Sequence, residues 1–298
     1  MNNFLIGQFN EFNDAKHDRD YKNSFWGMEG SSFNSHDEIK KWHEIVKKEN
    51  CNIGIHYPLR ANIGKIRDPL FMSKNDEVRK QAFDTILEEL ELYKALKPHY
   101  ILFHYPKPII LSNDVDWSTW RFGDRTEYVF ENEYSESEFR KYSEELFIWL
   151  TDVSEKYGFT PVLELDGLNK YIINSTFLDE LLEKYPKVRL CLDTGRLHLM
   201  EKVNPNFSSS DLIRRLGKYT DLIHLWNLKY NNGIENHHYP VSSDHSIEEG
   251  WGDIESMLKA IKAQNDSAVI LFEHQSQVIS EQELEECYEW VDSIYNGA

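Results

Sequence analysis

Short apolar segments alternate with longer amphipathic ones along this chain. The apolar segments hold about five residues, many of them branched or aromatic, a pattern typical of buried strands. The expected strands are residues 3–9, 25–29, 52–56 and 268–273, together with four that run into His104, Glu164, Asp193 and His224. The expected helices are residues 35–50, 75–97, 135–158, 175–185, 208–219, 246–264 and 280–295.

Capping signals support several of these helices. Ser35 and Glu38 have the spacing of a capping box, and Pro98 follows the end of the second helix. Residues 10–22 form a polar segment, and residues 105–134 and 227–245 are expected to be irregular. Eight strands that alternate with roughly eight helices predict a parallel sheet covered on both faces. We therefore predict a single-domain (β/α)8 TIM barrel over residues 1–298.

Six expected strands end in a side chain that can bind a metal. Functional residues of such barrels gather where the strands end, because the loops there converge on one axis. The six are His56, His104, Glu164, Asp193, His224 and Glu273. Together they form a candidate site, although any one of them alone would carry little weight.

Each of these residues also has a purely structural interpretation. A single histidine on an apolar strand is usually a hydrogen-bonded core residue, and a carboxylate there can cap a helix or pair with an arginine. Asp193 before Thr194 and Gly195 could simply shape a turn. However, six ionisable groups at one barrel mouth would be costly to bury without a cation. Imidazole mixed with carboxylate favours Zn, Mn, Co or Fe over an all-oxygen Mg or Ca site.

The composition narrows the class of partner. The chain has 298 residues, 40% hydrophobic and 13% aromatic, which excludes a disordered chain. Its formal net charge of -18 opposes non-specific binding to nucleic acid or anionic membranes. No apolar run approaches the thickness of a bilayer and no signal peptide is evident, so a cytoplasmic protein is expected. Three widely separated cysteines indicate buried thiols.

The barrel pattern with Glu164, Asp193, His224 and Glu273 at successive strand ends resembles the xylose isomerase-like superfamily of sugar isomerases, epimerases and endonuclease IV enzymes. The resemblance implies that these four residues bind one divalent metal and that Glu164 and Glu273 also move protons on the sugar. In endonuclease IV two further histidines build a second metal site. His56 and His104 stand at the matching positions, so one or two metals (Zn, Mn or Co) per chain are implied, with Glu164 as the bridge.

The sequence departs from endonuclease IV at its third metal site. Arg196 replaces a histidine, and Ser242 and Asp244 replace an Asp-x-His pair ahead of His245. A guanidinium cannot bind a metal, but its fork of donors suits a carboxylate or phosphate. Arg196 therefore either holds an anionic substrate group or pairs with an acid such as Glu201. We predict that it contacts substrate together with His245.

The segment of residues 105–134 is too long for an ordinary barrel connection. It carries Trp117 and Trp120, whose aromatic faces could stack on a sugar or a base, or could form a small core of their own or an oligomer contact. We predict that both contact substrate.

Two enzymatic interpretations and one non-enzymatic one follow. An isomerase or epimerase moves a proton next to a carbonyl, and a phosphodiesterase uses paired metals to activate water. His56 and His104 favour the second, whereas the missing third site and the net charge favour the first. A barrel that only binds a ligand would be expected to lack some metal ligand. We predict a metal-dependent sugar or sugar phosphate isomerase or epimerase, with endonuclease IV-like hydrolysis as the alternative and the oligomeric state left open.

Overall fold

The computed structural model describes residues 1–297. Eight strands form a closed barrel in the order β1, β12, β9, β8, β7, β4, β3, β2. They are β1 (Phe4–Phe9), β2 (Gly27–Ser31), β3 (Asn52–His56), β4 (Tyr100–Tyr105), β7 (Thr160–Leu165), β8 (Arg189–Asp193), β9 (Thr220–Leu225) and β12 (Val269–Phe272). The predicted (β/α)8 barrel is confirmed. A single domain over the whole chain stays a prediction.

Helices follow the barrel strands, as the alternating pattern predicts. They are α1 (Asp14–Asp20), α2 (His36–Glu49), α3 (Asp76–Tyr93), α4 (Glu136–Tyr157), α5 (Lys170–Ile173), α6 (Phe177–Lys184), α7 (Thr194–Val203), α8 (Ser209–Leu216), α9 (Ile254–Gln264) and α10 (Glu281–Tyr295). Two small sheets lie outside the barrel. They pair β5 (Ile109–Leu111) with β6 (Tyr128–Phe130), and β10 (Asn227–Tyr230) with β11 (Ile234–Tyr239).

The chain divides into two compact units. The larger unit consists of Gln8–Phe12 and Glu29–Leu190. The smaller unit consists of Met1–Gly7, Asn13–Met28 and Cys191–Ala298. We describe each by itself.

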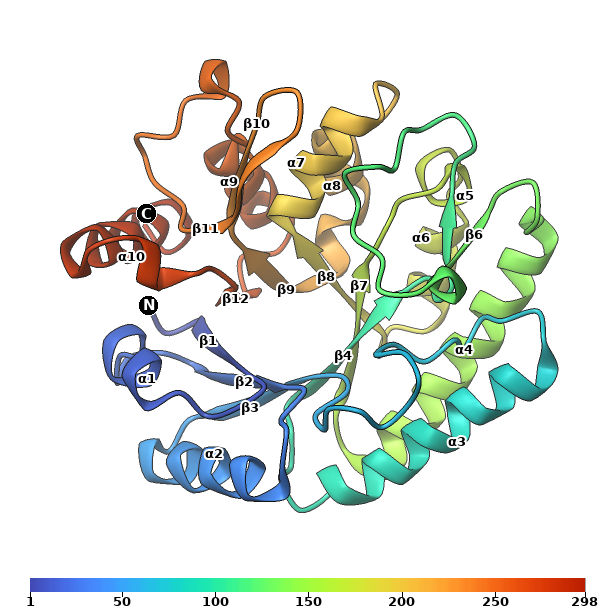
Figure 1. Ribbon diagram of the computed structural model, residues 1–298, viewed down its shortest axis with the longest axis horizontal. Helices are drawn as coiled ribbons and strands as arrows, with labels where there is room; N and C mark the ends of the chain where they lie inside the picture. Colours follow the sequence, from blue (N-terminus) through green and yellow to red (C-terminus); the bar gives the residue numbers. More distant parts are fainter. Residues whose placement is uncertain (298) are drawn as a thin grey trace. The chain divides into compact units, whose positions relative to one another are not determined.

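In the larger unit, β3, β4 and β7 are parallel neighbours. Their register sets His104 directly beside Glu164 and His56 beside Leu102. Helices α3 and α4 lie side by side (Figure 1), and the rings of Phe83 and Trp149 meet between them at 4.7 Å. Strand β4 is buried along its whole length, and the ring of Tyr105 at its carboxyl end packs against Phe139 and Phe147 of α4.

In the smaller unit, β9 pairs with β12, and β12 pairs with β1, all in parallel. The register matches His224 with Leu271. Glu273 lies two residues beyond Leu271, so it points to the same face as His224, because side chains alternate along a strand. The hairpin of β10 and β11 follows β9 directly (Figure 1).

Several boundaries differ from the sequence prediction. The polar segment after β1 contains α1, and the irregular segment at residues 227–245 contains the β10–β11 hairpin. The helix expected from residue 246 begins at Ile254, where Asp253 caps it. The capping box expected at Ser35 is only half formed, because the carboxylate of Glu38 instead accepts the N–H of Phe12.

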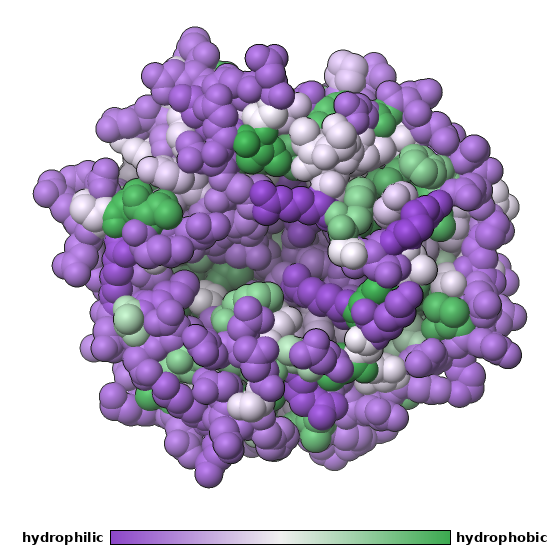
Figure 2. Space-filling view, in the orientation of Figure 1, coloured by the Kyte–Doolittle hydropathy of each residue, from purple (hydrophilic) through white to green (hydrophobic). Residues whose placement is uncertain are grey.

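The outer surface agrees with the composition. The face drawn in Figure 2 is covered mainly by hydrophilic side chains, with hydrophobic atoms in small scattered groups. All three cysteines are free, as expected. Cys191 and Cys287 are buried, whereas Cys51 is partly exposed, contrary to the expectation of three buried thiols. Among residues 1–297, every helix is too short or too polar to cross a bilayer. The cytoplasmic location expected from the sequence stays a prediction.

Candidate metal centre

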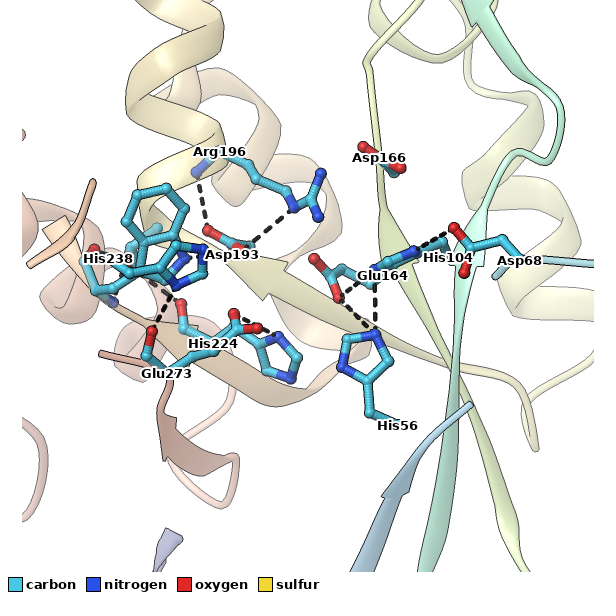
Figure 3. A network of polar contacts seen from close by, with 12 residues as sticks. His56, Asp68, His104, Glu164, Asp166, Asp193, Arg196, His224, His238 and Glu273 are labelled. Atoms are coloured by element: carbon cyan, nitrogen blue, oxygen red, sulfur yellow. Dashed lines mark hydrogen bonds and ion pairs between the residues drawn. The ribbon is translucent and has the colours of Figure 1, made fainter. Parts of the chain in front are cut away.

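In the larger unit, His56, His104 and Glu164 converge at the carboxyl ends of three adjacent strands (Figure 3). We call these residues the two-histidine cluster. The Nε2 atoms of the two histidines lie 3.1 Å apart. The Oε2 atom of Glu164 lies 3.3 Å from Nε2 of His104 and 4.0 Å from Nε2 of His56. All three side chains are buried, so two imidazole nitrogens and one carboxylate oxygen surround a single point.

The far side of each imidazole faces a second buried carboxylate. Nδ1 of His104 lies 2.9 Å from Oδ2 of Asp68, and Nδ1 of His56 lies 3.5 Å from Oε1 of Glu29. A carboxylate beside Nδ1 favours the tautomer with its proton there. Both Nε2 lone pairs are then directed toward Glu164, as metal ligands require.

The electrostatics of the two histidines differ. Burial and the charge of Arg67 lower the pKa of His56. Burial alone would also lower the pKa of His104, but Asp68 and Glu164 together raise it. A hydrogen bond between two Nε2 atoms needs one protonated and one unprotonated nitrogen. The 3.1 Å contact therefore needs a proton on Nε2 of one of the two rings, and a cation bound by both rings would take the place of that proton.

The spacing fits a tetrahedral metal. Ligands held at the usual zinc distances of about 2.0–2.1 Å lie about 3.3–3.4 Å from one another. The three separations in the two-histidine cluster range from 3.1 to 4.0 Å. This cluster could therefore hold a divalent cation through three protein ligands.

In the smaller unit, Asp193, His224 and Glu273 form a second group, which we call the Asp-His-Glu cluster (Figure 3). One ligand atom from each lies within 4.8 Å of the others. Nδ1 of His224 is 3.2 Å from Oε2 of Glu273. His224 is fully buried, whereas the side chain of Glu273 is 30% exposed. The group combines imidazole and carboxylate donors with access from solvent on one side.

Asp193 also caps a helix and pairs with an arginine, the structural roles that a carboxylate at a strand end can have. It is the N-cap of α7, where its Oδ1 accepts the N–H of Arg196 at 2.8 Å. Its Oδ2 accepts the indole N–H of Trp226 at 3.0 Å and lies 3.4 Å from Nε of Arg196. Arg196 thus pairs with Asp193, while Glu201 accepts from Ser209. These contacts fix the carboxylate of Asp193 in place.

Gly195 is required by the same arrangement. The sequence predicts a sharp turn at Thr194 and Gly195, but α7 starts directly at Thr194. A Cβ atom on Gly195 would lie 2.4 Å from the indole carbons of Trp226. The glycine therefore lets the indole reach Asp193.

His238 lies in β11 of the hairpin, and His245 lies in the segment that follows β11. The ring of His245 stacks on Trp251 at 3.8 Å, and its Nδ1 faces the amide nitrogen of Asn227 at 3.2 Å. Burial lowers the pKa of His245 to about 4. His238 stacks on Trp226 at 4.1 Å, and its Nδ1 donates to the backbone oxygen of Glu273 at 2.7 Å. The hairpin thereby braces Glu273.

Trp117 and Trp120 lie within the long segment after β4. Both are buried, with 9% and 8% exposure, and their rings meet edge to face at 5.5 Å. The indole N–H of Trp117 donates to the carbonyl of Ser112. This is the arrangement of a small internal core, and substrate contact by these tryptophans stays a prediction.

Sequence reasoning missed three residues next to His104. The Nζ atom of Lys107 lies 2.7 Å from Asp68 and 2.8 Å from Asp166, and all three side chains are buried. The sequence offered one signal, because Asp166 lies two residues after Glu164 and Lys107 three after His104. Asp68 comes from the loop after β3 and gave none. Whether the two-histidine and Asp-His-Glu clusters share one site stays a prediction.

Comparisons with known proteins identify the fold family. A model of the xylose isomerase-like TIM barrel family matches residues 23–294. No curated protein matches the chain.

Several solved structures are similar over nearly the whole chain. A D-tagatose 3-epimerase-like protein is 16% identical with a TM-score of 0.63, and the match covers 97% of this chain and 98% of that one. The 3-keto-D-glucoside 4-epimerase YcjR from E. coli is 14% identical with a TM-score of 0.59, at 97% and 98% coverage. The IOLI protein with a bound zinc atom is 13% identical with a TM-score of 0.61, at 98% and 99% coverage. At these identities the likeness establishes the fold alone.

Proposed function

The chain belongs to the xylose isomerase-like TIM barrel family, and we propose that it is a divalent-metal-dependent isomerase or epimerase acting on a sugar or sugar phosphate. The observation that carries the proposal is the set of imidazole and carboxylate groups at the strand ends, with spacings that fit a cation. One of the similar structures is named as a D-tagatose 3-epimerase-like protein and another as a 3-keto-D-glucoside 4-epimerase, which favours this chemistry over others on the same fold.

In this proposal Glu164, Asp193, His224 and Glu273 bind one cation. The assignment rests on the fold, because in a closed parallel barrel the carboxyl ends of all strands open on the same face, and these four residues end or follow β7, β8, β9 and β12. The cation supplies Lewis acidity, which makes the proton next to a sugar carbonyl easier to remove. His56 and His104 can hold a second cation with Glu164.

The two glutamates carry the proton transfers. A general base must hold a carboxylate within hydrogen-bond reach of the carbon-bound proton, and a second group must return the proton elsewhere. We assign these roles to Glu164 and Glu273. Glu164 is buried at the end of β7, and Glu273 is half-open to solvent and braced by His238.

Substrate contacts are assigned to four further residues. Arg196 is anchored through Nε by Asp193, and its side chain is 27% exposed, so its terminal nitrogens are proposed to bind a substrate hydroxyl, carboxylate or phosphate. His245, kept neutral by burial, is proposed as a hydrogen-bond partner of a hydroxyl. Trp117 and Trp120 are proposed to shape the wall of the substrate site.

Metal-dependent hydrolysis of a phosphodiester is the second candidate. It is favoured by one observation, the convergence of His56, His104 and Glu164 on a single point, which gives a set of three ligands within the larger unit. Paired cations can generate hydroxide and stabilise a leaving oxygen.

Metal content and solvent isotope exchange test both functions. The purified full chain would be analysed for metal atoms per chain and then incubated in D2O with ketoses, aldoses and their phosphates. An isomerase or epimerase replaces the proton next to the carbonyl with deuterium, which proton NMR detects as loss of that signal. Cleavage of abasic-site DNA without exchange would favour hydrolysis. A metal-free chain that exchanges no sugar proton and cleaves no DNA would refute both.

A further inference from the structure

We propose that Asp68, Lys107 and Asp166 form a buried positioning network that holds His104 with its proton on Nδ1, so that Nε2 is free to bind a cation. We call these three residues the lysine cage. The inference rests on the proposed metal site but is independent of which substrate the enzyme uses.

The cage is a continuous chain of close polar contacts within the larger unit. Asp68 uses one oxygen, Oδ2, for both Nδ1 of His104 at 2.9 Å and Nζ of Lys107 at 2.7 Å. On its other side Nζ of Lys107 reaches Oδ2 of Asp166 at 2.8 Å. Figure 3 shows Asp68 on the side of His104 that faces away from Glu164. The cage is therefore located behind the ligand and outside its first coordination shell.

Backbone hydrogen bonds hold Asp166 and Lys107 in position. The N–H of Asp166 donates to the carbonyl of Tyr105 at 2.8 Å. The carbonyl of Lys107 accepts the N–H of Met72 at 2.8 Å. The side chain of Lys107 is 3% exposed and that of Asp166 is 5% exposed. Lys107 and Asp166 are thus held by the main chain as well as by their ion pair.

The ammonium group of Lys107 lies beside a group of side chains that could otherwise bind a metal cation. Ligand atoms of Asp68, His104 and Asp166 lie within 4.8 Å of one another and could by themselves hold a metal. The ammonium of Lys107 lies between the two carboxylates and neutralises one of their two charges. With the ammonium there, Asp68 remains an acceptor for the Nδ1 proton, and a metal is directed to the opposite nitrogen of His104.

A stability role alone does not account for this arrangement. Burying charges carries a desolvation cost that their attraction often fails to recover, so apolar side chains would serve a core at least as well. A carboxylate behind a metal-binding histidine, by contrast, fixes the ring and strengthens it as a ligand. The cage meets the requirement for such a partner at His104, whose Nδ1 lies 2.9 Å from Asp68.

The test compares metal binding by the full-length wild type, Asp68→Asn, Lys107→Met and Asp166→Asn. Lys170→Met is the matched control, because Lys170 pairs with Glu131 in the same unit but is 52% exposed. Zinc affinity would be measured by chelator competition, and the visible absorption of bound Co2+ would report ligand geometry. Circular dichroism and thermal unfolding would establish that each variant is folded.

We expect Asp68→Asn and Lys107→Met to weaken zinc binding by about 10- to 100-fold and to change the Co2+ spectrum, whereas Lys170→Met leaves both unchanged. Asp166→Asn, which removes the charge of the carboxylate that pairs with Lys107, should give a smaller loss in the same direction. If Asp68→Asn and Lys107→Met do not fold, the zinc affinity of Asp166→Asn alone tests the inference. Wild-type affinity and spectrum in the folded variants would overturn the inference alone, whereas a wild type that binds no divalent metal would overturn the proposed function as well.

Discussion

The Nε2 atoms of His56 and His104 lie 3.1 Å apart, and each ring turns its Nδ1 toward a buried carboxylate. These polar contacts do not follow from the core packing of β3 and β4, because apolar residues at positions 56 and 104 would pack the core equally well. The Nδ1 atom of each buried imidazole has a carboxylate partner, so the two facing Nε2 atoms need a partner between them. Without a cation, the proton shared by the two rings has that role.

Metal binding should therefore stabilise the protein through these histidines. A ligand that binds only the folded state at 1,000 times its Kd adds about 4 kcal/mol, which corresponds to several degrees in Tm. We expect zinc to raise the Tm of the chelator-treated wild type, and His56→Ala and His104→Ala to reduce that increase. His36→Ala, at an exposed position at the start of α2, serves as the control. Equal zinc responses in all four proteins would contradict the assignment.

Gly195→Ala should destabilise the protein although alanine favours a helix. The gain in helix propensity is about 1 kcal/mol, whereas overpacking a core typically costs about 1–3 kcal/mol. The new methyl would lie 2.4 Å from the indole of Trp226, which is buried and cannot move freely. We expect a net loss of about 1 kcal/mol in the free energy of urea unfolding and a weaker bond from the indole to Asp193.

Gly7→Ala is the matched control for that substitution. Its new methyl would meet only Leu271 at 3.8 Å, an ordinary contact. The indole N–H resonance of Trp226 in NMR spectra should shift in Gly195→Ala and stay in place in Gly7→Ala. An unmoved resonance and unchanged stability in Gly195→Ala would mean that the close packing on Trp226 relaxes without cost.

The fold could be predicted because apolar segments of strand length alternate with helical ones throughout the chain. The strand ends were also predictable, since the last apolar residue is followed by His56, His104 or Glu164 within one or two positions. Elements without a strong apolar period were missed. Helix α1 is polar on most of its length, and α7 begins on the residue after β8 with no intervening loop.

The contact of Asp68 with His104 in the lysine cage could not be predicted from local sequence. Asp68 lies in a loop 36 residues before His104, and its charge there is typical of a solvated turn. Only the tertiary fold shows that Lys107 is enclosed between two carboxylates. The same holds for Asp193, whose helix-capping role and contact with Trp226 depend on residues from different elements.

His245 should titrate well below its ordinary range. Burial lowers its pKa to about 4, from 6.5 for an unperturbed histidine. The oxygen of Asn227 accepts from the N–H groups of Leu228 and Gly252, so its amide nitrogen must face Nδ1 of His245 and donate to it. Because the folded pKa lies below the unfolded one, the stability from neutral His245 is present above pH 6.5 and is lost as the pH falls toward 4.

An NMR titration of the ring protons measures this pKa directly, with His245→Gln to assign the signal. In urea unfolding, His245→Gln should lose less stability than the wild type between pH 7 and pH 4.5, because glutamine accepts the Asn227 bond without titrating. A midpoint for His245 near 6.5 would contradict the packing of its ring against Trp251.

Glu164→Gln and Glu273→Gln should each abolish most of the proton exchange. The amide has nearly the shape of the carboxylate but cannot take up a proton, and loss of a positioned acid or base lowers rates by about 10²–10⁴-fold. The measurement is deuterium uptake by the sugar that the wild type exchanges fastest, with metal content determined in parallel. Glu235→Gln in β11 is the control. Glu235 is exposed, and its carboxylate accepts a hydrogen bond from the side-chain amide of Asn231. Wild-type exchange rates in both variants, each with its metal bound, would show that the two glutamates take no part in the proton transfer. Loss of exchange together with loss of metal would show that their main role is to bind the metal.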